Sequence, residues 1–360
     1  MDTKSRLTTW VEAQLPDARD VRLHGLDRVE FGHSAETLLT TICWSDDAGD
    51  HQKDVVARLR PPAPGLLEPY DLRRQFDILR GLVHTPVRAP APLWFEPSGD
   101  VLGREFYLME RLAGTVYEMG SSEEPPEDPD LIRRMCESMI DQLAAIHLVD
   151  LDETGLEAIG DGSHYLEHEI SHWSDEIQRV QRGPLPALER LLKELQDQLP
   201  EPCPSVTLVH GDAKSGNYAF QDGEVSAVFD WELATVGDPL ADVGWAELLW
   251  LTPGSFTATN GALSADEFVA LWEERTGIES QHRAWYRAFQ TLKIAAISLV
   301  ASHLVDAGHS DDLRFVHMAY GIRPATTAAL RDLGVEADLP PGPVLPRKER
   351  REQVKAAQLP

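Results

Sequence analysis

The sequence predicts an α+β fold of two lobes, a small β-rich lobe followed by a larger, mainly helical one. Short β-rich stretches separated by turns occupy residues 20–60, and beyond about residue 130 apolar residues recur at helical spacing. A chain of 360 residues is long enough for two such lobes. We expect the first lobe to span 1–112 with one helix beside its sheet, the second to span 113–338, and a Pro-rich, charged tail to cover 339–360.

The elements of the first lobe follow from its hydrophobic patterns. "LLTTICW" and "DVVARLR", separated by the turn-rich "DDAGDHQ", predict a hairpin of two strands. A helix is predicted from about Asp71 to Leu82, because Leu72, Phe76 and Leu79 share one face. "REFYLMERLAG" supplies another strand.

The second lobe is predicted to be helical from its first long element onward. An acidic, Pro-rich loop, "GSSEEPPEDPD", precedes this element. The apolar residues that repeat at helical spacing up to His147 are Leu131, Met135, Met139, Leu143 and Ile146.

The composition limits the classes of function. The 33 Lys and Arg residues against 60 Asp and Glu residues give a net charge of -27, which argues against nucleic acid or an anionic membrane as partner. The longest apolar run, around 294–300, is too short for a membrane span, and "MDTKSRLTTW" lacks a signal-peptide pattern. The cysteines Cys43, Cys136 and Cys203 fit reduced thiols. We expect a cytoplasmic protein, with homo-oligomerisation left open.

One stretch suggests zinc chemistry. His168-Glu169-Ile170-Ser171-His172 has the spacing at which a helix offers zinc two imidazoles and a general base. An apolar stripe that includes Leu166 and Ile170 should face the core, however, so both histidines point to a polar surface or a cleft wall. No third ligand stands out. A zinc hydrolase is therefore only a remote alternative.

A second stretch, residues 205–245, predicts phosphoryl transfer. A buried strand ends at His210-Gly211-Asp212, so Asp212 lies on a loop at a strand end. Asp222-Gly223 predicts a two-residue hairpin turn, in which Phe220 would pair with Val225 and Asn217 with Val228. Asn217 and Asp230 would then point to the same face near the open end of the hairpin.

These side chains suit a reaction between polyphosphate and an alcohol. The oxygens of Asn217 and Asp230 form a hard-oxygen site suited to Mg²⁺. Asp212 is a separate carboxylate, which can accept the proton of an attacking hydroxyl. Lys214 projects from the same loop and could neutralise charge on the transferring phosphoryl group.

The motifs "HGDAKSGN", "FDWE" and "GDPLAD" closely resemble those of the aminoglycoside phosphotransferase family, small-molecule relatives of protein kinases. "LRPPAPGLLEPYDLRRQFDIL" and "DWELATVGDPLADVGW" are similar to the branch with the kinase-like domains of acyl-CoA dehydrogenase fusion proteins. The resemblance covers about residues 20–330 and implies a bilobal protein-kinase-like fold. It implies Asp212 as the catalytic base and Asn217 and Asp230 as the magnesium ligands. His210 would brace the loop, and Asp238 and Asp242 would hold it by hydrogen bonds.

The resemblance also implies a nucleotide site in the first lobe. "RVEFGHSAETLLTT" occupies the place of the phosphate-covering hairpin, with Gly32 and Ser34 at its tip. Arg58 falls where kinases keep a lysine, and could hold the α- and β-phosphates. The helix that usually supplies a glutamate partner has Gln75, with Asp71 one turn earlier, so the partner of Arg58 is left open.

The connector and the acceptor site complete the predicted cleft. In "FYLMERLAG", the backbone near Glu110 and Leu112 would meet the adenine ring. Aromatic residues crowd the second lobe, and the predicted acceptor-site residues are Tyr165, His168, His172 and Trp245. We favour a hydroxyacyl compound or another apolar alcohol over an aminoglycoside, because of the closer branch resemblance.

Two functions from different classes remain. The first is an ATP-dependent, Mg²⁺-requiring phosphotransferase acting on a hydroxyl group of a small molecule, with GTP left open as a replacement for ATP. The second is a catalytically silent, kinase-like nucleotide-binding protein, favoured by Gln75 and by the single glycine of the phosphate-covering hairpin. Retention of Asp212, Asn217 and Asp230 together favours the enzyme.

Overall fold

We describe the protein from a computed structural model that covers residues 2–28, 36–118 and 123–336. The predicted phosphate-covering residues Gly32 and Ser34 lie outside these ranges, as does the tail. The strands of the N-terminal sheet are β1 (Arg19–Arg28), β2 (Glu36–Asp46), β3 (Gly49–Leu59), β4 (Pro92–Glu96) and β5 (Phe106–Glu110). The helices before and beside it are α1 (Thr3–Gln14) and α2 (Leu72–Leu82).

The remaining elements belong to the mainly helical part. The strands are β6 (Thr115–Val116), β7 (Thr207–Val209), β8 (Tyr218–Gln221), β9 (Glu224–Val228) and β10 (Thr235–Gly237). The α-helices are α3 (Pro129–His147), α4 (Leu151–Thr154), α5 (Tyr165–Val180), α6 (Pro186–Asp197), α7 (Leu240–Leu249), α8 (Ala265–Thr276), α9 (Arg283–Ala307) and α10 (Leu313–Asp332). Short 3₁₀ turns are η1 (Leu156–Ile159), η2 (Ser215–Asn217), η3 (Trp231–Leu233) and η4 (Phe256–Ala258).

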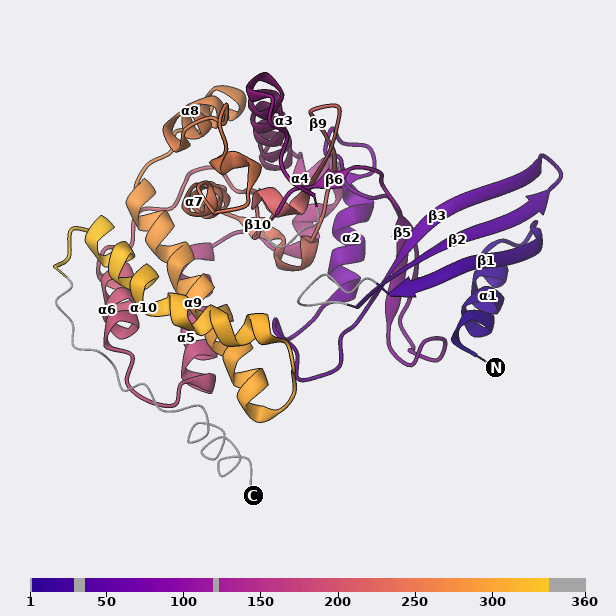
Figure 1. Ribbon diagram of the computed structural model, residues 1–360, viewed down its shortest axis with the longest axis horizontal. Helices are drawn as coiled ribbons and strands as arrows, with labels where there is room; N and C mark the ends of the chain where they lie inside the picture. Colours follow the sequence, from indigo (N-terminus) through magenta and orange to yellow (C-terminus); the bar gives the residue numbers. More distant parts are fainter. Residues whose placement is uncertain (1, 29–35, 119–122, 337–360) are drawn as a thin grey trace.

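The N-terminal part is an antiparallel sheet with strand order β1-β2-β3-β5-β4 (Figure 1). The predicted hairpin is confirmed as β2 and β3, which pair down to Asp46 opposite Gly49. The prediction of one helix in residues 1–112 is wrong, because α1 also forms there. Leu7 and Val11 of α1 are fully buried in the same core as β1, and this contact stabilises a helix that the sequence pattern did not reveal.

Helix α2 connects the sheet to the helical part and confirms the predicted helix. The Asp71 side chain caps its first turn by accepting the Arg74 N–H. Leu72, Phe76 and Leu79 are buried, as their spacing predicts. In Figure 1 α2 lies between the sheet and the helices of the second part.

Helix α9 is central to the helical part, because it packs against α5, α6, α7 and α10. In the part of the chain that the structure describes, it is also the one helix long and apolar enough to cross a membrane. Of the most apolar stretch of this helix, 18 residues long, 78% is buried inside the protein. The architecture is α+β, with a sheet at one end and helices at the other, as predicted; the residue boundaries of the two lobes stay a prediction.

The hairpin of β8 and β9 differs by one residue from its predicted register. Asp222 and Gly223 form the turn with positive φ angles, and Phe220 pairs with Val225 as predicted. A register shift follows between Ala219 and Phe220, so Tyr218 rather than Asn217 pairs with Val228. One extra residue on β9, a β-bulge, explains the shift.

A buried carboxylate on α7 ties the loop after β7 to the helical core. Asp242 Oδ2 accepts the His210 N–H at 2.6 Å, and Asp242 Oδ1 accepts the Gly211 N–H at 2.8 Å. His147 Nε2 of α3 lies 3.1 Å from Asp242 Oδ2, while its Nδ1 accepts the Trp272 indole N–H of α8. Because Nδ1 accepts, Nε2 must be the protonated nitrogen that donates to Asp242.

The two predicted loop-holding aspartates have different partners. Asp242 contacts the loop as expected, but the expectation for Asp238 is wrong. Asp238 accepts hydrogen bonds from the Cys203 N–H, the Leu240 N–H and the Tyr286 hydroxyl, so it joins α7 to α9 instead.

The contacts of Asp242 predict a pH-dependent contribution to stability. Burial alone would raise its pKa, but hydrogen bonding to His147 and the backbone N–H of His210 outweighs burial, and the pKa is lowered. A lowered pKa stabilises the fold above the unfolded-state pKa, and this contribution disappears as the pH falls through the folded-state pKa. We expect Asp242→Asn to lower the free energy of unfolding by about 2–4 kcal/mol at neutral pH.

Urea unfolding at about pH 7 and about pH 3.5 measures this difference between parent and variant, which should shrink at the lower pH. Asp222→Asn, the same change at the exposed hairpin turn, is the matched control and should alter stability by less than about 0.5 kcal/mol. A difference for Asp242→Asn that does not depend on pH, or that equals the control, contradicts the expectation.

Candidate functional site

The site is built around the loop that follows β7. Asp212 is only 9% exposed. Its Oδ2 accepts Asn217 Nδ2 at 2.8 Å and lies 3.1 Å from Lys214 Nζ, whereas its Oδ1 is buried and has no hydrogen-bond partner among the described residues. One carboxylate oxygen is therefore held in place, and the other is left to accept a proton.

His210 braces this loop through both ring nitrogens. Its Nε2 lies 2.7 Å from the Phe229 carbonyl oxygen, which can only accept, so Nε2 carries the proton. Its Nδ1 then accepts the Asp212 N–H at 3.2 Å. His210 therefore holds the Phe229 carbonyl and the backbone of Asp212 at the same time. Its role in catalysis stays a prediction.

Lys214 is positioned to remain charged. Asp212 is the main cause of its raised pKa, and Asp230 adds to it, while burial opposes the shift. The ammonium group therefore lies between two carboxylates of the site at neutral pH. Glu118, half-buried on the connection after β6, also acts on it.

Asn217 and Asp230 come close together at the open end of the hairpin. The N–H of Phe229, next to Asp230, donates to the Asn217 carbonyl at 2.8 Å. Asn217 Nδ2 faces the Asp212 carbonyl at 2.7 Å as well as its carboxylate, so the amide nitrogen is fixed and Oδ1 turns away from both. Asp230 adopts a left-handed conformation with φ 66, which is unusual outside glycine and frequent at functional sites.

The guanidinium of Arg58 reaches Asp230 from the sheet. The distance from Arg58 Nη2 to Asp230 Oδ1 is 3.1 Å, and Glu232 Oε2 lies at 3.8 Å. Burial alone would lower the pKa of Arg58, but Asp230, Tyr107 and Glu232 together outweigh burial and raise it. The side chains of Asn217 and Asp230 offer an amide oxygen and a carboxylate, which are donors of the kind that a divalent ion such as Mg²⁺ prefers.

Neither of the two candidate partners of Arg58, Gln75 and Asp71, pairs with it. Buried Gln75 accepts the Tyr107 hydroxyl at 3.3 Å, and Asp71 caps α2. The partners are Asp230 and Glu232 of the helical part instead. A local sequence pattern could not indicate this pair, because Arg58 and Asp230 are 172 residues apart in the chain.

The predicted adenine-binding backbone lies at the end of β5. The Glu110 N–H donates to the Ala91 carbonyl at 2.9 Å, and Arg111 donates to Asp54. Glu110 therefore lies at the edge between the sheet and the helical part, with Leu112 two residues further along the chain. Both positions stay predictions.

The predicted acceptor-site residues fall into two pairs. Tyr165 is half-buried with its ring against Gly237, and buried Trp245 lies near the loop through Lys293. Burial raises the pKa of Tyr165 well above its usual value, so its hydroxyl stays protonated. His168 and His172 are exposed on the outer face of α5, and we describe no contact from either to the loop.

The geometry of α5 does not favour the zinc hypothesis. Glu169, which would have to act as the general base, accepts the Trp173 indole N–H at 3.0 Å. Within residues 2–28, 36–118 and 123–336 no three His, Cys, Asp or Glu side chains gather as a metal site.

Two residues from distant parts of the chain lie next to the loop, and no sequence pattern indicated that they would. Buried Lys293 of α9 donates to the Gly211 carbonyl at 2.6 Å. Glu118 lies so close to Gly216 that an added Cβ there would be 2.4 Å from Glu118 Oε2. Neither residue belongs to a recognisable motif.

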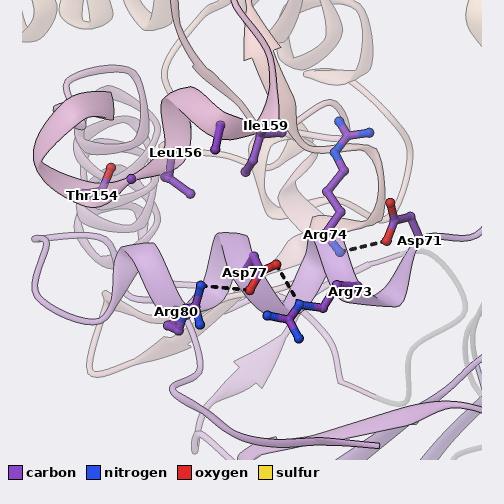
Figure 2. A pocket seen from close by; sticks show the side chains of 10 residues that line it. Asp71, Arg73, Arg74, Asp77, Arg80, Thr154, Leu156 and Ile159 are labelled. Carbon is purple, nitrogen blue, oxygen red and sulfur yellow. Dashed lines mark hydrogen bonds and ion pairs between the residues drawn. The ribbon is translucent and has the colours of Figure 1, made fainter. Parts of the chain in front are cut away.

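A separate cavity of about 360 Å³ lies between α2 and the α4–η1 segment (Figure 2). Arg73, Arg74 and Arg80 line it together with Asp71 and Asp77. Asp77 pairs with Arg73 and Arg80, and Arg74 donates to the Ala234 carbonyl. None of the predicted catalytic, metal or nucleotide residues lines this cavity.

Comparisons with known proteins identify the family of this chain. The chain matches the phosphotransferase enzyme family over residues 43–289. Mouse acyl-CoA dehydrogenase family member 10 is 31% identical over 285 residues, which are 76% of this chain and 26% of that protein. Human acyl-CoA dehydrogenase family member 11 is 27% identical over 271 residues, 71% of this chain and 34% of that protein. The chain therefore spans about a quarter to a third of the length of these relatives.

Solved structures share the fold. A Ralstonia eutropha protein, provisionally described as an aminoglycoside phosphotransferase, has a TM-score of 0.74 and 24% identity over 92% of this chain and 98% of its own. An aminoglycoside phosphotransferase mutant in a ternary complex with ADP and hygromycin B has a TM-score of 0.56 and 16% identity over 91% of this chain and 98% of its own. The resemblance inferred from the motifs is confirmed, and the chain belongs to the phosphotransferase enzyme family.

Proposed function

We propose that this protein is an ATP-dependent, Mg²⁺-requiring phosphotransferase that acts on a hydroxyl group of a small molecule. The observation that supports this most strongly is that the two carboxylate oxygens of Asp212 have different surroundings. Its Oδ2 is held by Asn217 and Lys214, while its buried Oδ1 has no partner among the described residues. A carboxylate oriented in this way can take the proton of an acceptor hydroxyl as the oxygen attacks phosphorus.

The other groups would manage the negative charge of the nucleotide. Asn217 and Asp230 would hold Mg²⁺, and the bound ion would neutralise charge on the β- and γ-phosphates. Lys214 would stabilise charge on the transferring group, and Arg58 would exchange Asp230 for phosphate oxygens. Complexes of the structural relative with ADP and hygromycin B support a nucleotide and a small-molecule acceptor as the two substrates.

We favour a hydroxyacyl compound or another apolar alcohol as the acceptor. The half-buried ring of Tyr165 beside Gly237 is the aromatic group that we assign to this acceptor, because aromatic surfaces suit an apolar molecule better than a polycation. The names of the curated relatives, acyl-CoA dehydrogenase family members, agree with an acyl substrate.

The alternative is a kinase-like protein that binds nucleotide without turnover, and Asp212→Asn separates the two. We expect turnover to fall by about 10³-fold, because the amide cannot accept the proton, while affinity for Mg-ADP changes less than about threefold. ADP release is measured with a panel of hydroxyacyl thioesters, apolar alcohols and aminoglycosides, and binding by calorimetry.

Asp222→Asn is the matched control and should behave like the parent. If no compound in the panel is phosphorylated although Mg-ADP binds, the binding protein is the better description. If the parent does turn over but Asp212→Asn turns over equally fast, Asp212 is not the catalytic base.

The metal assignment predicts a separate loss. In Asn217→Ala and in Asp230→Asn, the Mg²⁺ concentration that half-saturates nucleotide binding should rise by at least about tenfold, because the first change removes an oxygen ligand and the second removes the negative charge of the carboxylate ligand. Nucleotide titrations over a range of Mg²⁺ concentrations measure this, again with Asp222→Asn as control. An unchanged Mg²⁺ dependence in both variants argues that the metal binds elsewhere.

A further inference from the structure

Lys293 is a buried cation that the proposed chemistry does not use. It lies on α9 and is 3% exposed. Its Nζ donates to the Gly211 carbonyl at 2.6 Å, in the middle of the His210-Gly211-Asp212 sequence. Burying an ammonium group costs free energy unless the group is well paired. The contact between Lys293 and the Gly211 carbonyl is therefore expected to have a function.

Two indole rings hold the ammonium group in place. The Nζ atom lies 4.9 Å from the ring centroid of Trp245 on α7 and 5.6 Å from that of Trp173 on α5. Distances below about 6 Å are in the range of cation–π attraction. Three helices therefore converge on one nitrogen atom, and its position is fixed from sides remote from the loop.

The contact fixes one particular peptide unit. Lys293 binds the carbonyl of the unit between Gly211 and Asp212, and His210 Nδ1 binds the N–H of the same unit at 3.2 Å. Gly211 has φ +81, and an added Cβ would lie 2.4 Å from the Leu233 carbonyl oxygen, so only glycine fits here. Because glycine leaves the adjoining peptide free to rotate, its orientation depends on these two hydrogen bonds, one from His210 within the loop and one from Lys293 outside it.

Asp242 holds only the preceding part of the loop. Its two oxygens bind the N–H groups of His210 and Gly211, and neither reaches the peptide unit that leads into Asp212. The orientation of this unit sets the direction in which the Asp212 side chain leaves the backbone. The contact from Lys293 therefore has a role that Asp242 does not duplicate.

We propose that Lys293 is a positioning residue for the phosphoryl transfer proposed above: by holding the Gly211 carbonyl, it directs the Asp212 carboxylate toward the acceptor hydroxyl. Burial lowers the pKa of Lys293, and the carboxylates of Glu169, Asp212 and Asp242 limit this shift by favouring its charged form. A charged donor makes a stronger hydrogen bond to the carbonyl than a neutral one.

Lys293→Met tests the proposal, because methionine has a similar length, fits between aromatic rings and removes both the donor and the charge. Gln290→Met is the matched control: Gln290 lies on the same helix, is 2% exposed, and donates to the Ala241 carbonyl of α7 at 2.8 Å rather than to the loop. Mg-ADP affinity and the unfolding midpoint show whether each variant is folded.

Two readouts are compared. Hydrogen exchange at the Gly211 and Asp212 amides should be about tenfold faster in Lys293→Met than in the parent, relative to the amides of β7, and close to the parent in Gln290→Met. In the acceptor assay kcat should fall by about 10²-fold in Lys293→Met with little change in the KM for ATP, and by less than about threefold in Gln290→Met.

The outcomes distinguish this proposal from the proposed function. If the parent has no phosphotransferase activity, the proposed function fails, and the exchange comparison still decides whether Lys293 orders the loop. Equal exchange in the two methionine variants, or a kcat for Lys293→Met within threefold of that for Gln290→Met, overturns the positioning role.

Discussion

The structure depends on a buried carboxylate, Asp242, that organises the loop after β7 from within the helical core. Its two oxygens bind consecutive backbone N–H groups, and His147 and Trp272 extend the contact to α3 and α8. A charged acceptor inside the protein is stable only when its hydrogen bonds are satisfied. The loop can therefore adopt only backbone geometries that keep these bonds, which fix the segment that leads to Asp212.

The two parts of the molecule share an apolar core that includes Phe76 and Trp231, and polar contacts also join them. Arg58 of β3 reaches Asp230, and Arg74 of α2 reaches the Ala234 carbonyl. Asp230 is also the proposed metal ligand, so a guanidinium and a metal ion would bind the same carboxylate. Entry of a charged nucleotide would redistribute these contacts, since phosphate oxygens can take over Arg58. The link between sheet and helices and the proposed binding of nucleotide thus involve the same side chains.

Local patterns predicted much of this arrangement. The Asp222-Gly223 turn, the β2–β3 hairpin and the apolar face of α2 each depend on neighbours within a few residues, and they formed as expected. The prediction placed Asn217 on a strand opposite Val228, but Asn217 lies in a 3₁₀ turn before β8 and Asp230 has a left-handed conformation after β9. A bulge changes pairing without a clear sequence signature.

Long-range contacts could not be predicted in the same way. Lys293 has no motif, and it becomes relevant only because α9 packs against both α5 and α7. The partners of Arg58, Asp230 and Glu232, come from the other part of the molecule rather than from α2. Helix α1 has a weak pattern of its own and is stabilised by burial of Leu7 and Val11 against the sheet.

The central claim is that Asp212, Asn217 and Asp230 surround one cation-bound triphosphate. A crystal structure with Mn²⁺ and a non-hydrolysable ATP analogue tests it most directly, because anomalous scattering locates the metal. We expect Mn²⁺ within about 2.5 Å of both Asn217 Oδ1 and Asp230, with Arg58 released from Asp230 toward the phosphates and Asp212 facing the terminal phosphate. A metal or triphosphate bound away from these three residues would contradict the account.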